Sequence, residues 1–264
     1  MSKIIDGNVL AKKHEEILKE KLESIKKVRA PIVISFCNQD DPPSVKYTFM
    51  KLAKASDLGI DFVAEEFSAN TPREYLEKMV NKYSKDSEID GILVQLPLPE
   101  NLNPFREGLL NLIPLEKDID GLRDESPYLP ATVKAVISIL DENVKEWKSE
   151  KIAVVGATGE VGKPMVKYLK ENNVTVSEIS RNLGNLDTDL KDADIIVSAV
   201  GEENLIKEEM IKNGVILIDV GLGDFDSGCY ERASMYTPKT GGVGPMTVIS
   251  LMENVVESYA SKFS

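Results

Sequence analysis

The regular alternation of short β-branched segments with helical segments constrains the fold of this chain more than any other feature. An apolar run at 32–36 precedes a helical stretch at 44–58, and a second run at 60–67 precedes a helical stretch at 72–83. The same order returns from residue 152 onward. Strands joined by helices run parallel within one sheet, so the pattern predicts an α/β protein with mostly parallel sheets.

Capping signals set the expected limits of these elements. Ser44 suits the N-cap of the helix at 44–58, and Gly59 is placed to end that helix. We expect further helices at 6–28, 130–144 and 245–261, and further strands at 89–96, 152–155, 174–179, 194–200 and 215–219.

The stretch 97–128 interrupts this rhythm because it is rich in proline and glycine. It predicts a boundary near residue 122, between a first α/β domain at 1–122 and a second at 123–244. The final helix, at 245–264, can pack back on the first domain or stay with the second. A chain of 264 residues is long enough for two such domains with separate cores.

Composition excludes several classes of protein. Lys and Arg number 32 against 44 Asp and Glu, so the net charge is 32 − 44 = −12, the opposite of a generic nucleic-acid binder. Two cysteines, Cys37 and Cys229, cannot form a disulfide framework, and a single histidine, His14, cannot build a multi-histidine metal site. No segment is typical of a signal peptide or a membrane span, so we expect a soluble cytoplasmic protein without a metal.

A glycine-rich turn follows the strand at 152–155. Its glycines, Gly156, Gly159 and Gly162, let the chain turn tightly, let the backbone approach a pyrophosphate, and let the next helix pack closely on the sheet. The spacing differs from the common G-x-G-x-x-G, and a tight turn without a ligand stays open as the alternative. The βαβ context favours a Rossmann-type dinucleotide-binding domain.

Polar side chains in the first half of the chain form a second group of candidates. Tyr47 and Lys51 are four residues apart and so share one helix face, which by itself is typical of an ordinary half-buried helix. Gln95 ends an apolar strand just before a proline, where polar side chains rim ligand crevices in α/β folds. Asp118 and Asp120 follow Lys117 in a loop, and alone would be solvated charges.

Together these motifs resemble those of the methylenetetrahydrofolate dehydrogenase/methenyltetrahydrofolate cyclohydrolase family. The resemblance covers nearly the whole chain. It rests on Ser44-x-x-Tyr47-x-x-x-Lys51, Asp90-Gly-Ile-x-Val-Gln95-Leu-Pro-Leu-Pro, Pro114-x-x-Lys117-Asp-x-Asp120-Gly, Gly156-x-x-x-x-Val161-Gly-Lys-Pro164 and Gly241-Gly-Val-Gly-Pro-Met-Thr247.

The resemblance implies two α/β domains flanking a cleft, and a homodimer that oxidises 5,10-methylenetetrahydrofolate and hydrolyses the methenyl product to 10-formyltetrahydrofolate. It implies that Lys51 is the general acid/base, that Tyr47 stacks on the folate, that Gln95 tunes Lys51, and that Asp120 anchors the pterin. The implied substrate-binding residues are Ser44, Tyr47, Leu96, Pro97, Asp120, Gly242 and Pro245, and the implied cofactor-binding residues are Gly156, Ala157, Thr158, Gly159, Gly162, Ser180, Arg181 and Leu222.

The residues give two indications about the cofactor. Glu178 lies 178 − 156 = 22 residues after the first glycine, near where an acid binds the ribose hydroxyls in NAD enzymes. Ser180 and Arg181 instead suit the 2′-phosphate of NADP. Ala157 stands where the family usually has an arginine that faces this phosphate. We expect NADP, with NAD as the alternative.

Two other functions stay open at this point. One is a dehydrogenase for a related pterin that lacks the hydrolase step, and the other is a non-catalytic pterin-binding relative. The joint presence of Lys51, Tyr47, Gln95 and Asp120 argues against a protein that only binds.

Overall fold

The structure is a computed structural model that describes residues 3–25, 29–180 and 190–263. It confirms the α/β prediction, since every strand pair is parallel and helices connect the strands. The chain forms two compact units, one of residues 1–12 and 132–247, and the other of residues 13–131 and 248–264. The boundary that we expected near residue 122 therefore falls inside the second of these units. Among the described helices, none is long and apolar enough to span a membrane.

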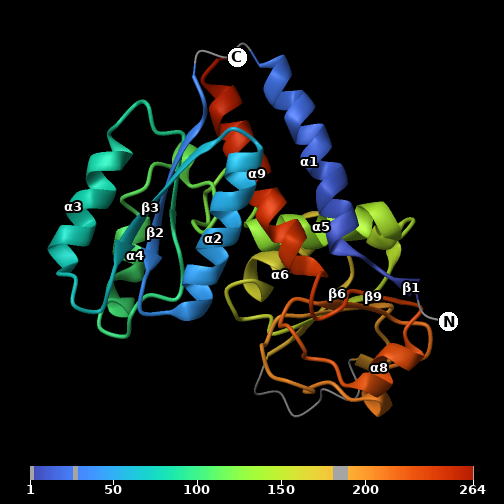
Figure 1. Cartoon of the computed structure of the whole chain (residues 1–264). Coiled ribbons are helices and arrows are strands. Elements are labelled where there is room, and N and C mark those ends of the chain that lie inside the picture. The colour runs from blue at the N-terminus through green and yellow to red at the C-terminus, as the bar shows by residue number, and fades with distance from the viewer. Residues whose placement is uncertain (1–2, 26–28, 181–189, 264) are drawn as a thin grey trace. The chain divides into compact units, whose positions relative to one another are not determined.

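The unit of residues 13–131 and 248–264 is built on a three-stranded sheet with the order β3-β2-β4. Helices α2 and α3 cover opposite faces of this sheet (Figure 1). Its elements are β2 (Ile32–Asn38), α2 (Pro42–Asp57), β3 (Asp61–Phe67), α3 (Arg73–Ser84), β4 (Gly91–Val94), α4 (Arg106–Leu110) and the 3₁₀ turns η1 (Asn103–Phe105) and η2 (Leu115–Lys117). Strands β2 and β4 are almost entirely buried, so their apolar runs form the centre of this core.

The unit of residues 1–12 and 132–247 contains a parallel six-stranded sheet with the order β1-β9-β8-β7-β5-β6. Its strands are β1 (Lys3–Ile4), β5 (Ile152–Val155), β6 (Val176–Ile179), β7 (Ile195–Ser198), β8 (Ile216–Asp219) and β9 (Met235–Tyr236). Its other elements are α5 (Ala131–Asn143), η3 (Trp147–Ser149), α6 (Gly162–Glu171), η4 (Glu208–Met210) and α8 (Ser227–Arg232). Strands β5, β7 and β8 are buried along their whole length, as expected for the middle of a doubly wound sheet.

Three described helices contain the points at which the chain passes between the units. These points lie inside α1 (Gly7–Ser24), after the first residue of α5, and inside α9 (Val243–Ser261). The last helix therefore belongs in part to each unit. A sequence pattern could not decide this, because α9 is apolar along most of its length.

Several expected limits were wrong. The N-cap of α2 is Asp41 and not Ser44, because the Asp41 carboxylate accepts the Ser44 N–H at 2.9 Å and Pro42 begins the helix. The strand expected at 89–96 is only Gly91–Val94, so Gln95 lies just beyond it. The first helix ends at Ser24. The sequence analysis missed strands β1 and β9, since each has only two residues and is too short to show an alternation of apolar and polar side chains.

Candidate functional site

The carboxyl ends of β2 and β4 carry the substrate-binding candidates of the first half of the chain. Helix α2 connects β2 to β3 on one side and the chain then returns to β4 on the other side of β2, so the strand order reverses between β2 and β4. Ligands in open parallel sheets bind at such a reversal, outside the carboxyl ends. Gln95 lies at this edge, where its backbone N–H donates to the carbonyl of Phe36 at 2.8 Å.

Lys51 projects from α2 into this edge and is 6% exposed. Its Nζ donates to Oε1 of Gln95 at 2.7 Å, which is the contact that the family resemblance implies. Burial lowers the pKa of Lys51, and the nearby Asp120 carboxylate and Cys37 thiol offset part of this effect. A lysine in this setting can lose its proton at a lower pH than a lysine in water.

The loop that carries Asp120 lies beside β4, because Asp118 pairs with Ile92 of that strand. Lys117 and Asp118 are buried, so Asp118 is not the solvated charge that the sequence alone suggested. The Nζ of Lys117 donates to the carbonyls of Ser84 and Asp86 at the end of α3. Burial raises the pKa of Asp118 to about 6. Asp120 itself is half-buried at the surface of this loop.

The remaining substrate candidates of this unit lie at the N-terminus of α2 and after β4. Ser44 is buried, and its Oγ donates to Asp41 at 2.5 Å and approaches the carbonyl of Leu96 at 3.4 Å. Tyr47 and Leu96 are half-buried, and Pro97 is exposed. Ser44 therefore ties the start of α2 to the segment that carries Gln95.

The glycine-rich turn forms the corresponding edge of the six-stranded sheet. Gly156 has a φ of +86°, and a Cβ there would lie 2.8 Å from the carbonyl oxygen of Ala199, so this turn packs against the loop after β7. A Cβ at Gly162 would lie 2.0 Å from the oxygen of Gly156. Helix α6 begins at Gly162, and among the described residues no side chain caps its first turn. Free N–H groups at a helix N-terminus suit the pyrophosphate of a dinucleotide.

Two family models match successive parts of the chain. Residues 130–263 match the family model described as the tetrahydrofolate dehydrogenase/cyclohydrolase NAD(P)-binding domain, and residues 5–120 match the model of the catalytic domain of the same family. This chain belongs to the tetrahydrofolate dehydrogenase/cyclohydrolase family.

Relatives and solved structures support this membership over nearly the full length. The bifunctional protein FolD of Bacillus velezensis is 34% identical over 97% of this chain and 96% of its own length. A bifunctional FolD enzyme from Campylobacter jejuni has a TM-score of 0.91 at 31% identity and covers 99% of both chains. The Trypanosoma brucei enzyme, solved with NADP and an inhibitor, has a TM-score of 0.90 at 28% identity over 99% of this chain and 98% of its own.

In this member of the tetrahydrofolate dehydrogenase/cyclohydrolase family, the cofactor candidates differ in their surroundings. Ala157 and Gly162 are buried, while Thr158 and Gly159 are exposed at the turn. Leu222 is 45% exposed and has a φ of +64°, in the turn after β8. Ser180 is half-buried at the end of β6, and Glu178 of that strand forms an ion pair with Lys170. Arg181 lies outside the residues that the structure describes.

The sequence analysis missed Asp224, which organises the loop after β7. This carboxylate is fully buried and accepts hydrogen bonds from Ser198 Oγ at 2.6 Å and from three backbone N–H groups, those of Val200, Gly201 and Glu202, at 2.9 Å each. Burial and the Asp224 carboxylate raise the pKa of the neighbouring Asp219. Nothing in a sequence marks this role, because Asp224 and Ser198 are 26 residues apart.

The second glycine-rich segment, at 241–247, packs on the first turn of α1. The Gly7 N–H donates to the carbonyl of Gly241 at 2.8 Å, and a Cβ at Gly7 would lie 1.7 Å from the oxygen of Gly242. Gly242 is buried and Pro245 is half-buried in the first turn of α9. Gly7 thus allows the close approach that fixes the Gly241-Gly242 segment, another role that no sequence motif indicated.

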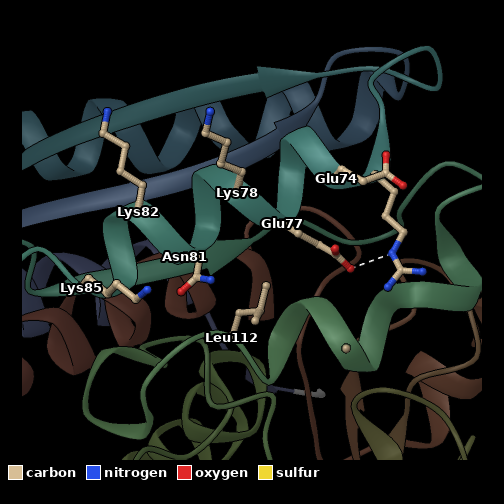
Figure 2. Close-up of a pocket in the computed structure, with 9 residues that line it drawn as sticks. Glu74, Glu77, Lys78, Asn81, Lys82, Lys85 and Leu112 are labelled. Atoms are coloured by element: carbon tan, nitrogen blue, oxygen red, sulfur yellow. Dashed lines mark hydrogen bonds and ion pairs between the residues drawn. The ribbon is translucent and has the colours of Figure 1, made fainter.

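Two open hollows on the surface contain none of the candidate residues. One, of about 640 Å³, lies along α3 and is lined by charged side chains, with Arg73 paired to Glu77 (Figure 2). The other, of about 680 Å³, lies along the outer face of α2 around the exposed Phe49. Among the described residues no three His, Cys, Asp or Glu side chains gather closely enough to hold a metal ion.

Proposed function

We propose that this protein catalyses the NADP-dependent oxidation of 5,10-methylenetetrahydrofolate to 5,10-methenyltetrahydrofolate and the hydrolysis of that product to 10-formyltetrahydrofolate. The observation that carries the proposal is the buried Lys51, which donates to Gln95 at the strand reversal and lies within electrostatic range of Asp120. Membership of the tetrahydrofolate dehydrogenase/cyclohydrolase family supports this proposal.

Lys51 has the properties that the hydrolytic step requires. The methenyl group is a cationic amidinium, and water must add to its bridging carbon and lose a proton. With its pKa lowered by burial, Lys51 can accept this proton and return it to the ring nitrogen as the carbon–nitrogen bond breaks. Gln95 holds the Lys51 amine in place without adding a charge that would raise its pKa.

The oxidative step needs positioning and no protein base. When bound, NADP accepts the hydride from the methylene carbon, and the protein has to hold the two ring systems in register. In the proposal Tyr47 packs against the folate rings, and the Asp120 carboxylate accepts hydrogen bonds from the pterin edge. Ser44, Leu96 and Pro97 line the same edge of the sheet.

The turn at 156–162 fits a dinucleotide, since its glycines leave space at the uncapped start of α6. In the proposal Gly156, Ala157, Gly159 and Gly162 approach the pyrophosphate with their backbone. NADP is favoured over NAD because Glu178, the residue suited to bind ribose hydroxyls, is paired with Lys170. That pairing lowers the negative charge that a 2′-phosphate would meet near Ser180. Arg181→Ala should raise the KM for NADP about 10- to 100-fold and leave that for NAD nearly unchanged.

The proposal includes a homodimer in the cytoplasm, with the folate-binding residues in the first half of the chain and the NADP-binding residues in the second. Both cysteines are free and buried, which suits a reducing compartment. Light scattering coupled to size exclusion tests the dimer, because a single species of one-chain mass would contradict it.

A spectrophotometric assay tests the function directly. Formation and decay of the methenyl chromophore are followed with methylenetetrahydrofolate and with methylenetetrahydromethanopterin, each with NADP and with NAD. We expect formation and decay with the folate. Formation without enzymatic decay would identify a monofunctional dehydrogenase, turnover of only the methanopterin would identify a different substrate, and no turnover would leave a binding protein.

A further inference from the structure

Helix α9 holds the loop that carries Asp120 through one buried amide. Asn254 is 1% exposed, and its Nδ2 donates to the carbonyl of Ile119 at 2.9 Å and to that of Leu129 at 3.0 Å. These two carbonyls stand at the two ends of the loop 120–128. A single side-chain amide, which has two N–H groups, thus joins both ends of the loop.

Contacts within the loop 120–128 couple its two ends, so a displacement of the backbone at Ile119 or Leu129 is passed on to the rest of the loop. The Asp118 carboxylate accepts the N–H of Arg123 at 3.1 Å, and Ser126 Oγ donates to the carbonyl of Asp118 at 3.2 Å. Gly121 lies against the far end of the loop, because a Cβ there would be 2.6 Å from the oxygen of Tyr128. A shift at either end therefore moves the segment around Asp120.

The peptide that Asn254 holds is the one that leads into Asp120. Ile119 is completely buried, so its carbonyl has no access to water to replace the amide of Asn254. One turn later on α9, Ser258 Oγ lies 2.7 Å from the carbonyl of Glu116 and fixes the start of the same segment. Asp120 is half-buried and follows Ile119 directly in the chain.

We propose that Asn254 is a positioning residue for substrate binding, which acts by fixing the backbone at Ile119 and so the direction of the Asp120 carboxylate. This rests on the proposed function, in which Asp120 accepts hydrogen bonds from the pterin. Asn254 is 135 residues from Ile119 in the chain and has no part in the chemistry itself.

The first test is Asn254→Leu, which keeps the approximate volume and removes both N–H groups. The KM for methylenetetrahydrofolate should rise about tenfold, and no more than in Asp120→Ala, while kcat and the KM for NADP change little. Ser250→Ala is the matched control, since Ser250 is buried one turn earlier on α9 and its Oγ has no hydrogen-bond partner within the described part of the chain. Asn254→Ser, which shortens the side chain but stays polar, serves if Asn254→Leu does not fold.

A double-mutant comparison separates positioning from a general effect on the fold. In an Asp120→Ala background, Asn254→Leu should raise the folate KM less than twofold, because the carboxylate that it positions is gone. An equal factor in both backgrounds, or a rise in the NADP KM of similar size, would overturn the inference. Wild-type turnover of methylenetetrahydrofolate tests the proposed function separately, so an active enzyme with an unchanged KM in Asn254→Leu would refute only the role of Asn254.

Discussion

The two sheet edges that carry the candidate residues, one in each unit, are built by opposite means. At the edge of β2 and β4, the candidate groups are side chains, namely the buried Lys51 and its half-buried partner Gln95. At the edge of β5 and β7, glycines bring backbone close to backbone, and no side chain in the described part of the chain caps the start of α6.

The difference indicates what each edge can tolerate. Chemistry that moves a proton depends on the pKa of one group, which burial and neighbouring charges set, so a change of a single atom matters. Binding of a pyrophosphate depends on backbone N–H groups, which every residue except proline has, so side chains there can vary as long as Gly156 and Gly162 stay without a Cβ. Ala157, in place of the arginine usual in the family, lies at the second kind of edge.

The largest effect should come from removing the amine at the side-chain edge. Lys51→Met should lower cyclohydrolase activity by about 10²- to 10⁴-fold and reduce the dehydrogenase less, because only the hydrolysis needs a positioned base. Decay of the methenyl chromophore measures the first and its formation the second. Lys46→Met is the control, since Lys46 is exposed on the same helix. Equal and small losses in both activities would show that Lys51 is not the acid/base.

The second prediction concerns the buried Asp118. Its pKa is raised from 3.8 to about 6 in the folded protein, so the folded state binds the proton more tightly than the unfolded state. The stability from this group is complete below pH 4 and is lost as the pH rises through 6. The free energy of unfolding of the wild type, relative to that of Asp118→Asn, should therefore fall by about 3 kcal/mol between pH 3 and pH 7.

Urea unfolding at a series of pH values measures this difference. The exposed Glu125→Gln in the same loop is the control, because its carboxylate stays in contact with water. A constant difference between the wild type and Asp118→Asn across this range would mean that burial does not hold the proton on Asp118.

At the backbone edge, Gly162→Ala should damage cofactor binding through packing alone. Its Cβ would lie 2.0 Å from the oxygen of Gly156, so the turn must move, at a cost of about 1–3 kcal/mol. We expect a rise of about tenfold in the KM for NADP, a lower melting temperature and a smaller change in the KM for folate. Gly159→Ala, whose Cβ would be 3.2 Å from the same oxygen, should lower the melting temperature less. Equal losses of stability in the two variants would refute the packing argument.

The smallest effect tests the tuning of Lys51 by a neutral partner. Gln95→Glu places a carboxylate beside the amine and should raise the pKa of Lys51, so the rise of cyclohydrolase activity with pH should move up by about one unit. Gln39→Glu adds the same charge at an exposed position after β2 and should leave the profile in place. A pH profile that does not move in Gln95→Glu would argue that another group limits the rate.

Much of the fold followed from local patterns. The alternation of apolar runs with helical stretches predicts parallel sheets, because a helix that crosses back over the sheet lets the second strand start at the same end as the first. The glycine-rich turn was recognisable because tight turns and close approaches admit few other residues. The order of the motifs also sufficed to indicate the family, and the spacing of Tyr47 and Lys51 placed both on one helix face.

Tertiary structure decided what surrounds these residues. The i, i+4 spacing gives a face but no depth, so only the packing of α2 on the sheet shows that Lys51 is buried and that its pKa is lowered. Asp41 and Ser44 are equally suitable N-cap residues by type, and Pro42 can occupy the first turn of a helix. Only the structure shows that Asp41 is the N-cap. Lys117, Asp118, Asp224 and Asn254 act on backbone groups that are distant in sequence or hidden by burial, up to 135 residues away for Asn254. Such contacts form only where folding brings distant segments of the chain together, and a local sequence pattern does not show which segments these are.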